Sequence, residues 1–311
     1  MIVPDGSSGG PPDGVTYQKG QGREPASTKK FYIFGHNISH SLSPTIHNEG
    51  FKHTGFDGHY TVHESLKVDS RIAALLADPD FGGASVTLPH KLQVADLLDF
   101  VSPAAKKIGA INTISKKDGK LWGDNTDWSG IKSCIDSAGI TGLADAPAIV
   151  LGAGGAARAA CYALVELGIP RILVVNRTRS KAEAMISRFP EASFDICETL
   201  EEAVEASKTA PPRVVIGCIP ADDLTEDKIP TRLFGGAEPG ILVEMAYKPP
   251  VTGMEKAAVK HLNWRIFKGV DILREQGYAQ FSIWTGIEAP KEVMSRAMEE
   301  ELKRRAVTQK Q

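Results

Sequence analysis

The sequence predicts a two-domain α/β fold with a mostly parallel sheet in each domain. Two observations lead to this prediction: short apolar segments alternate with helical stretches from residue 31 to about residue 125, and a second run of the same kind begins near residue 147. Alternating strands and helices favour a parallel sheet with helices on both faces. The length of 311 residues is sufficient for two domains, each with its own hydrophobic core.

The first run supplies three strands and two helices. The predicted strands are short and contain aromatic or β-branched residues, which are frequent in strands. We expect strands at residues 31–34, 59–63 and 83–88, an amphipathic helix at 66–77 and a second helix at 91–100. Residues 116–120 follow as a hairpin turn, because Asp-Gly between two strand-like segments favours a tight turn.

The second run begins with a buried-strand pattern at residues 148–151 that ends in a cluster of glycines. A helix is expected at 156–167, and further strands are expected at 171–175, 213–217 and 240–245. This order of elements is typical of a complete nucleotide-binding unit. From Gly269 onward we expect helix, strongly charged towards its end.

Composition argues against several classes of function. The formal net charge is -2, and no cluster of Lys and Arg has the pattern expected for binding a phosphate backbone. The longest apolar stretch, residues 146–175, is interrupted by Arg158, Glu166 and Arg171, so it lacks the ~20 uncharged residues that a membrane span needs. We expect neither a nucleic-acid partner nor a membrane segment.

The cysteines and histidines indicate a reduced protein without a metal. The cysteines are far apart and form no CxxC pair: Cys134, Cys161, Cys197 and Cys218. Free thiols are typical of a reducing compartment, so we expect a cytoplasmic protein. Seven of the eight histidines lie between His36 and His90, but their spacing matches no ligand motif, and we expect no metal site.

The first 28 residues are rich in Gly, Pro, Ser and Lys and contain almost no large apolar side chains. Such a segment cannot bury enough surface to offset the entropy lost on ordering. We expect residues 1–28 to be a disordered tail.

The glycine cluster predicts a dinucleotide site. It comprises Gly152, Ala153, Gly154, Gly155 and Ala156, between a predicted strand and a predicted helix. Residues without a Cβ let a pyrophosphate approach the backbone, and the helix N-terminus supplies N–H donors and partial positive charge. A turn that serves packing alone is the alternative, but the strand–turn–helix context favours nucleotide binding by a Rossmann-type domain.

The end of the next strand favours NADP. An NAD site usually has Asp or Glu there, to bind the ribose hydroxyls. This chain has Asn176, Arg177, Thr178 and, three residues on, Lys181. Arginine flanked by amide and hydroxyl donors would bind a 2′-phosphate, which a carboxylate would repel. The alternative is a basic turn that only begins the next helix.

Three segments of the first run carry polar residues that packing does not require. In the first, Ser43 followed by Pro44 fits a helix N-cap, which leaves Ser41 unexplained; two hydroxyls at a helix N-terminus would also bind a carboxylate. In the second, Thr87 and Lys91 follow a strand, where open α/β sheets bind ligands. A solvated lysine at a helix start is the alternative there.

The third segment has two polar ends, at residues 109–113 and 123–127. Turn chemistry alone would account for their Asn, Thr and Asp residues. The predicted hairpin, however, would bring the two ends together.

Together these motifs resemble the shikimate dehydrogenase family of shikimate and quinate dehydrogenases, over residues 31 to 290. The segments at 244–250 and 281–286 look most like the shikimate dehydrogenase domain of the fungal arom polypeptide. The motifs that carry the resemblance occur in the expected order: Ser41-Leu42-Ser43-Pro44, Val86-Thr87-Leu88-Pro89-His90-Lys91, Gly109-Ala110-Ile111-Asn112-Thr113, Gly123-Asp124-Asn125-Thr126-Asp127, Gly152-Ala153-Gly154-Gly155, Asn176-Arg177-Thr178 and Gln276-Gly277.

The resemblance implies a role for each matching residue. Lys91 and Asp127 would form the catalytic pair, and Ser41 and Ser43 would hold the substrate carboxylate. The ring hydroxyls would be bound by Thr87, Asn112 and Gln276, with Tyr247 nearby. Gly269 is expected to contact the cofactor together with the glycine cluster and residues 176–178 and 181. Reducing a ring ketone needs a hydride on carbon and a proton on oxygen, and a lysine beside a carboxylate suits the second task.

The implied function is a shikimate dehydrogenase, which reduces 3-dehydroshikimate to shikimate reversibly with NADP(H). Lys181 stands where an arginine is frequent in the family, so NAD use stays open. Residues 217–220 replace an Asn-x-Thr sequence found near the nicotinamide in many members. The alternatives are a quinate or dual quinate/shikimate dehydrogenase using NAD(P), and a non-catalytic regulatory protein of the same fold.

The predicted domain organisation follows from these assignments. The substrate-binding catalytic domain would comprise residues 29–126 and 269–311, and the NADP-binding Rossmann domain residues 127–268. A cleft between the two would hold both ligands. We expect a monomer or homodimer with small-molecule partners only.

Overall fold

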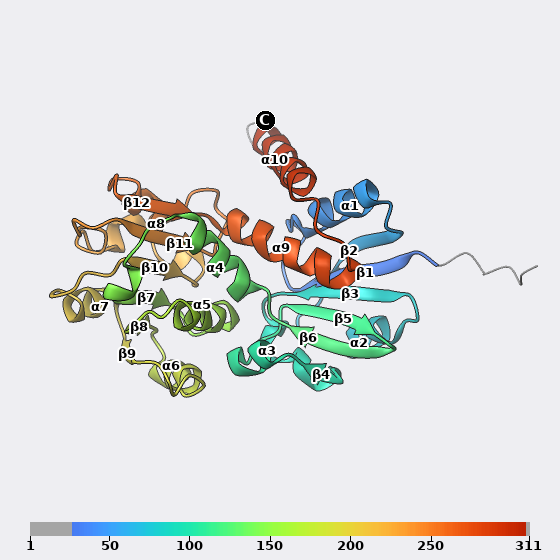
Figure 1. The fold of residues 1–311 in the computed structure, drawn as a ribbon, viewed down its shortest axis with the longest axis horizontal. Coiled ribbons are helices and arrows are strands. Elements are labelled where there is room, and N and C mark those ends of the chain that lie inside the picture. Colours follow the sequence, from blue (N-terminus) through green and yellow to red (C-terminus); the bar gives the residue numbers. More distant parts are fainter. Residues whose placement is uncertain (1–26, 309–311) are drawn as a thin grey trace, which may run out of the picture.

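The computed structural model describes residues 27–308, which fold into two α/β lobes, each built on a six-stranded sheet (Figure 1). Apart from Ser27 and Thr28, the predicted tail at residues 1–28 lies outside the described residues.

The first sheet has the strand order β2-β1-β3-β5-β6-β4. Three of its pairings are parallel (β1 with β2, β1 with β3, β4 with β6), and the two that involve β5 are antiparallel. The predicted hairpin is confirmed: Lys117 pairs with Lys120, and the intervening Asp118 and Gly119 both have positive φ, as a type I′ turn requires. The strands are β1 (Lys29–Gly35), β2 (Gly58–Glu64), β3 (Phe81–Val86), β4 (Phe100–Val101), β5 (Thr113–Lys117) and β6 (Lys120–Asp124).

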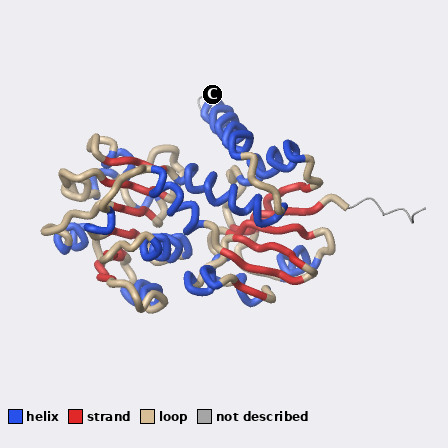
Figure 2. The backbone as a smooth tube through the Cα atoms, in the orientation of Figure 1, coloured by secondary structure: helices blue, strands red, loops and turns tan. Residues whose placement is uncertain are grey.

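The second sheet is parallel throughout, in the order β12-β11-β10-β7-β8-β9. Strand order reverses between β7 and β10, and open parallel sheets bind nucleotides at such a point. Strands β7 and β10 are buried along their whole length because helices cover both faces of the sheet (Figure 2). The strands are β7 (Ala148–Leu151), β8 (Ile172–Val175), β9 (Phe194–Cys197), β10 (Val214–Gly217), β11 (Gly240–Glu244) and β12 (Trp264–Phe267).

The helices divide the hydrophobic core into layers. On the second sheet, α4, α5 and α6 pack on one face and α7 and α8 on the other; on the first, α1, α9 and α10 lie opposite α2 and α3. The helices are α1 (Ser43–Thr54), α2 (Ser70–Ala77), α3 (Pro103–Ile108), α4 (Asp127–Ser137), α5 (Gly155–Glu166), α6 (Arg179–Ile186), α7 (Leu200–Ala206), α8 (Gly253–Ala258), α9 (Gly269–Thr285) and α10 (Lys291–Thr308).

Two predictions about the first run were wrong. Residues 91–100 form no α-helix but two short 3-10 helices, η1 (His90–Leu92) and η2 (Val94–Leu97), followed by β4. The Lys91 carbonyl accepts a hydrogen bond from Ile111 N–H at 2.8 Å, so it is not used within a regular helix. Helix α2 begins at Ser70 rather than residue 66, because the Asp69 carboxylate caps it by accepting from the N–H groups of Arg71 and Ile72.

Helix α9 connects the two lobes. Its Ile272 belongs to the core of the second sheet, whereas Tyr278 and Phe281 belong to the core of the first, and Figure 1 shows the helix lying between them. The predicted domain limits at residues 126/127 and 268/269 coincide with the starts of α4 and α9. We propose these positions as the domain borders.

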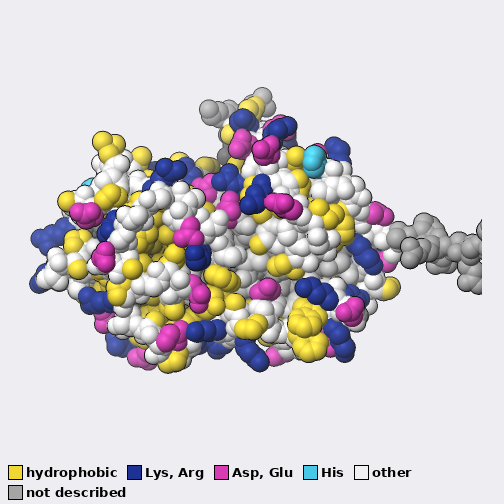
Figure 3. Space-filling view, viewed as in Figure 1, with side chains coloured by type: hydrophobic (Ala, Val, Ile, Leu, Met, Phe, Trp, Pro, Cys, Tyr) yellow, Lys and Arg dark blue, Asp and Glu magenta, His cyan; other side chains and the backbone are white. Residues whose placement is uncertain are grey.

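The surface carries mixed charge. Basic and acidic side chains are interspersed over the face that Figure 3 presents. Within residues 27–308 no helix is both long enough and apolar enough to cross a membrane.

Candidate active site

A cavity of about 380 Å³ lies between the two lobes, at the carboxyl ends of both sheets. All eight residues predicted to bind or convert the substrate line it: Ser41, Ser43, Thr87, Lys91, Asn112, Asp127, Tyr247 and Gln276. Two of the predicted cofactor residues, Ala156 and Gly269, line it as well. Segments from both runs of the sequence therefore meet at one place.

Lys91 and Asp127 form an ion pair on the cavity wall. Lys91 comes from η1, after β3, and Asp127 is the first residue of α4. The lysine Nζ lies 2.6 Å from Asp127 Oδ2, and the two side chains are 16% and 8% exposed. Low exposure strengthens the attraction and excludes water that would compete for the ammonium group. The pair thus offers a proton donor held at a fixed place.

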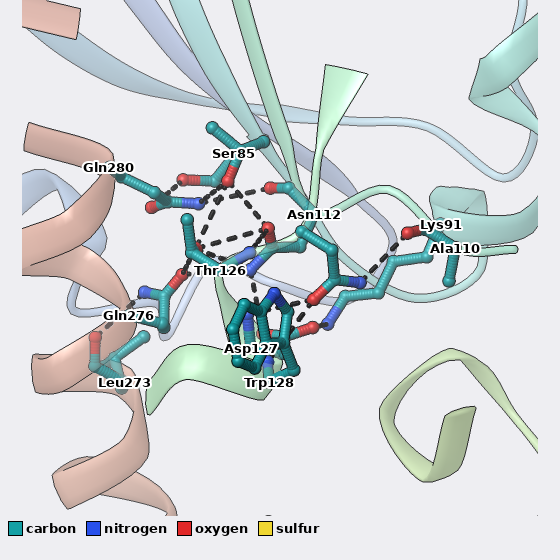
Figure 4. A network of polar contacts seen from close by, with 12 residues as sticks. Ser85, Lys91, Ala110, Asn112, Thr126, Asp127, Trp128, Leu273, Gln276 and Gln280 are labelled. Atoms are coloured by element: carbon teal, nitrogen blue, oxygen red, sulfur yellow. Dashed lines mark hydrogen bonds and ion pairs between the residues drawn. The ribbon is translucent and has the colours of Figure 1, made fainter. Parts of the chain in front are cut away.

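Asn112 holds the other carboxylate oxygen. Its Nδ2 donates to Asp127 Oδ1 at 2.9 Å and lies 3.2 Å from Gln276 Oε1 (Figure 4). The backbone of Asp127 is held as well, because its N–H donates to Asn125 Oδ1 at 3.0 Å. Asn112 and Asp127 thus meet as predicted, since the β5–β6 hairpin brings its two ends together.

The two serines lie at the start of α1, and the alternative role of Ser43 as a helix cap does not hold. Helix α1 begins at Ser43, whose side chain makes no cap hydrogen bond. Instead, Ser41 Oγ accepts from Ser43 N–H at 3.2 Å. Ser43 is almost fully buried and lines the cavity. Its hydroxyl is not used to cap the helix.

The glycine cluster follows β7 and begins α5. Gly152 has φ +109, and a Cβ there would lie 3.0 Å from the Cys218 carbonyl oxygen. A Cβ at Gly154 would have no neighbour within 4 Å, and a Cβ at Gly155 would lie 3.1 Å from Lys91 Cβ. The residues thus leave room for a phosphate at the N-terminus of α5, and this N-terminus lies against Lys91. Such a loop fits a dinucleotide.

Residues 176–178 form a basic turn after β8, and Lys181 lies exposed in the first turn of α6. Asn176 Nδ2 donates to the Thr178 carbonyl at 2.8 Å, which shapes the turn. Within residues 27–308, no carboxylate lies within ion-pair distance of Arg177 or Lys181. Arg179, by contrast, is paired with Glu183 at 3.1 Å. Two uncommitted cations at this position suit a phosphate ligand.

Several cavity residues escaped the sequence analysis. Ser85, Gln280, His40 and Lys248 line the cavity. Two of them had a signal: Ser85 is two residues from Thr87 on an extended segment, and Gln280 is one helical turn from Gln276, so each shares a face with a predicted residue. The ring of His40, in the first lobe, lies 5.7 Å from that of Tyr247 in the second (centroid to centroid), so the two residues meet across the cavity.

Glu244 holds the base of the loop that carries Tyr247. It ends β11 and is buried, and its carboxylate accepts from Ala246 N–H and from the Thr252 hydroxyl, both at 3.1 Å. Burial raises the pKa of Glu244 from 4.5 to about 7, with a smaller upward contribution from the Glu255 carboxylate. The two hydrogen bonds oppose this rise.

Replacing Glu244 with glutamine is expected to change how stability depends on pH. Because the pKa of Glu244 in the folded protein exceeds its ordinary value, folding loses stability as pH rises from about 4.5 through about 7. Glu244→Gln keeps the shape but cannot ionise, so its free energy of unfolding should exceed that of the wild type by on the order of 2 kcal/mol above neutral pH and by less in acid.

Denaturant unfolding at a series of pH values measures this difference, with the exposed Glu238→Gln as control. If the curves of wild type and Glu244→Gln run parallel from acid to neutral pH, Glu244 does not titrate as described.

Three family models match the chain along its length. The shikimate dehydrogenase substrate binding domain matches residues 33–114, the shikimate / quinate 5-dehydrogenase model residues 137–222, and the shikimate 5′-dehydrogenase C-terminal domain residues 269–299. A curated relative is the pentafunctional AROM polypeptide of Mycosarcoma maydis, which is 39% identical over 302 residues. The match covers 86% of this chain and 18% of that polypeptide, so the chain spans less than a fifth of its length.

Solved structures match most of the chain. Shikimate 5-dehydrogenase from Thermus thermophilus, in complex with shikimate, is 32% identical and has a TM-score of 0.74, covering 88% of this chain and 99% of that one. The same protein in complex with NADP(H) and shikimate gives 30% identity and a TM-score of 0.72 at the same coverage. These matches confirm the predicted two-domain α/β fold, and the chain belongs to the shikimate dehydrogenase family, a family of oxidoreductases.

Proposed function

We propose that this chain reduces 3-dehydroshikimate to shikimate, reversibly, with NADP(H). The observation that carries the proposal is the buried Lys91–Asp127 pair, which faces the same cavity as the hydroxyl and amide side chains of Ser43, Thr87 and Gln276. Relatives that bind shikimate and NADP(H) have the same fold. A pair of this kind is suited to proton transfer at a carbonyl oxygen.

In the proposed mechanism Lys91 donates a proton to the oxygen of the ring ketone. NADPH, when bound, supplies the hydride to the carbon. Asp127 orients the lysine ammonium through Oδ2, and Asn112 fixes the carboxylate through Oδ1. In the reverse direction Lys91 accepts the proton of the hydroxyl. The buried position of the pair keeps water from competing in either direction.

Ser41 and Ser43 are proposed to bind the substrate carboxylate. Both line the cavity at the N-terminus of α1, where backbone N–H groups and the helix dipole also favour an anion. Thr87, Asn112 and Gln276 are proposed to bind the ring hydroxyls, and Tyr247 closes the side formed by the second lobe.

Replacing Ser43 with alanine is expected to raise the KM for shikimate by roughly 10-fold or more, since a hydrogen bond to a charged group contributes ~1.5–3 kcal/mol. The affinity for NADP+ should stay unchanged. Steady-state kinetics measure both, and Ser207→Ala, a serine that is equally buried but lies just after α7, next to neither ligand, is the control. An unchanged shikimate KM would remove Ser43 from the carboxylate site.

The glycine cluster, Asn176, Arg177, Thr178, Lys181 and Gly269 are proposed to hold NADP(H). The support is the room beside Gly154 and the two cations, Arg177 and Lys181, which have no carboxylate partner among residues 27–308. Lys181 is a point charge and not a bidentate fork, so we propose NADP as the preferred cofactor and NAD as a weaker one.

The four free cysteines support a cytoplasmic location. Burial raises the pKa of the Cys134 and Cys161 thiols to about 12, which keeps them from reacting. The oligomeric state stays a prediction of monomer or homodimer, and the mass in solution measures it.

Turnover by the purified chain tests the proposed function. Oxidation of shikimate with NADP+ should proceed and should be followed by the absorbance of the reduced nicotinamide. Saturable binding of shikimate without any turnover would instead identify a non-catalytic protein of this fold. The presence of both Lys91 and Asp127 in contact argues against that alternative.

A further inference from the structure

A chain of five hydrogen bonds between buried side chains ends at Asp127, and Figure 4 labels four of its members, Ser85, Gln280, Asn112 and Asp127. We call it the donor chain, because each member donates to the next. Its bonds are Tyr60 hydroxyl to Ser85 Oγ (2.6 Å), Ser85 hydroxyl to Gln280 Oε1 (2.8 Å), Gln280 Nε2 to Thr113 Oγ1 (3.0 Å), Thr113 hydroxyl to Asn112 Oδ1 (2.6 Å) and Asn112 Nδ2 to Asp127 Oδ1 (2.9 Å).

The direction of the donor chain is fixed at Gln280. Its Nε2 also donates to the backbone carbonyl of Asn112 at 3.1 Å, and a carbonyl can only accept. The amide nitrogen of Gln280 must therefore face β5, and its Oε1 must face Ser85, which donates to it.

Gln280 in turn fixes the Thr113 hydroxyl. Because Thr113 Oγ1 accepts from Gln280, its single hydrogen is left for another acceptor. Two oxygens are within reach, Asn112 Oδ1 at 2.6 Å and Thr126 Oγ1 at 3.2 Å. The shorter distance favours Asn112.

Asn112 connects the Thr113 hydroxyl to the proposed catalytic pair. Its Oδ1 accepts from Thr113 and from Thr126 N–H at 2.7 Å, so its amide nitrogen must point to Asp127. A flipped amide would place an oxygen against the carboxylate. With Oδ1 of Asp127 occupied by Asn112, Oδ2 is left to face Lys91 at 2.6 Å.

We propose that Gln280 is a positioning residue for the reaction: by directing the Thr113 hydroxyl to Asn112 Oδ1, it supports the amide orientation that Thr126 N–H also favours, and so helps to hold Asp127 against Lys91. This inference rests on the proposed function. This positioning role differs from holding α9 against β5. Trp284, one turn further along α9, provides that attachment separately, since its Nε1 donates to the Ile114 carbonyl at 2.9 Å.

Four variants separate these roles. Gln280→Met removes the amide, and Thr113→Val breaks the next link with a side chain of the same shape. Both are expected to lower kcat roughly 10-fold, as is typical when a group that orients a functional side chain is lost. The KM for shikimate should change little, and the acid limb of the pH–rate profile for shikimate oxidation, in which Lys91 accepts the proton, should move to lower pH because the ammonium of Lys91 is less well stabilised.

The two control variants leave the hydrogen bonds of the donor chain intact. Thr113→Ser retains the donor and should keep wild-type kcat, and Trp284→Phe removes only the docking bond and should leave the pH profile unchanged. Thermal unfolding of all four measures their stability.

Three results would overturn the inference. The first is a raised KM at unchanged kcat in Gln280→Met, which would make Gln280 a direct substrate contact. The second is wild-type kcat and pH profile in both Gln280→Met and Thr113→Val. The third is an equal loss of kcat in Trp284→Phe. Turnover of the wild type in the same assay tests the proposed function separately.

Discussion

Replacing Lys91 with methionine is expected to lower kcat by ~10²-fold or more, since general acid–base catalysis contributes at least that factor where proton transfer is required. Methionine has a similar length but no proton to donate. The cofactor should bind as before, because the residues proposed to hold the nucleotide lie on other segments: the loop after β7 and the turn after β8.

The same substitution leaves the buried Asp127 without its partner, which destabilises a folded protein. Asp127→Asn in the Lys91→Met background removes the unpaired charge and separates this loss from the loss of the proton donor. Lys106→Met, at an exposed lysine in α3, is the control for the substitution itself. Wild-type kcat in the Lys91→Met variant would show that the lysine does not transfer the proton.

Replacing Arg177 with serine is expected to raise the KM for NADP+ by roughly 10- to 100-fold, since a charge-assisted hydrogen bond to phosphate is about twice as strong as a neutral one. The KM for NAD+, which lacks the 2′-phosphate, should change little. The preference for NADP+ over NAD+ should therefore fall by the same factor, which steady-state kinetics with both cofactors measure.

Arg171→Ser is the matched control for Arg177→Ser. Arg171 precedes the same strand, β8, at its opposite end and is paired with Asp195. Its loss should leave both cofactor constants unchanged. An equal rise in the KM of NADP+ and NAD+ after Arg177→Ser would place the arginine away from the 2′-phosphate.

Local patterns predicted those parts of the fold that depend on local chemistry. Strand β7 and the glycines after it follow from a short apolar run and the geometry of a tight turn. The β5–β6 hairpin follows from Asp118-Gly119. Residues 91–97 differ because the Lys91 carbonyl is bound by Ile111 N–H, a partner twenty positions along the chain. The hydrophobic periodicity of a short stretch of sequence cannot predict a hydrogen bond between residues this far apart.

The candidate site divides in the same way. Asn112 and Asp127 could be placed together because a hairpin joins the segments that carry them, whereas only the family resemblance joined Lys91 to Asp127. The part played by Gln280 could not be predicted, because it depends on Thr113, which lies 167 positions away in the sequence. Ser43 carried a capping signal, yet the cap it suggested does not form, because Ser43 is already the first residue of α1 and Leu42 occupies the N-cap position.

The catalytic efficiencies of the purified chain on shikimate and on quinate, each with NADP+ and with NAD+, test the central claim most directly. If the cavity is built for the shikimate ring and the turn after β8 for a 2′-phosphate, shikimate with NADP+ will have the highest kcat/KM of the four pairs. A higher kcat/KM for quinate with NAD+ would contradict both assignments.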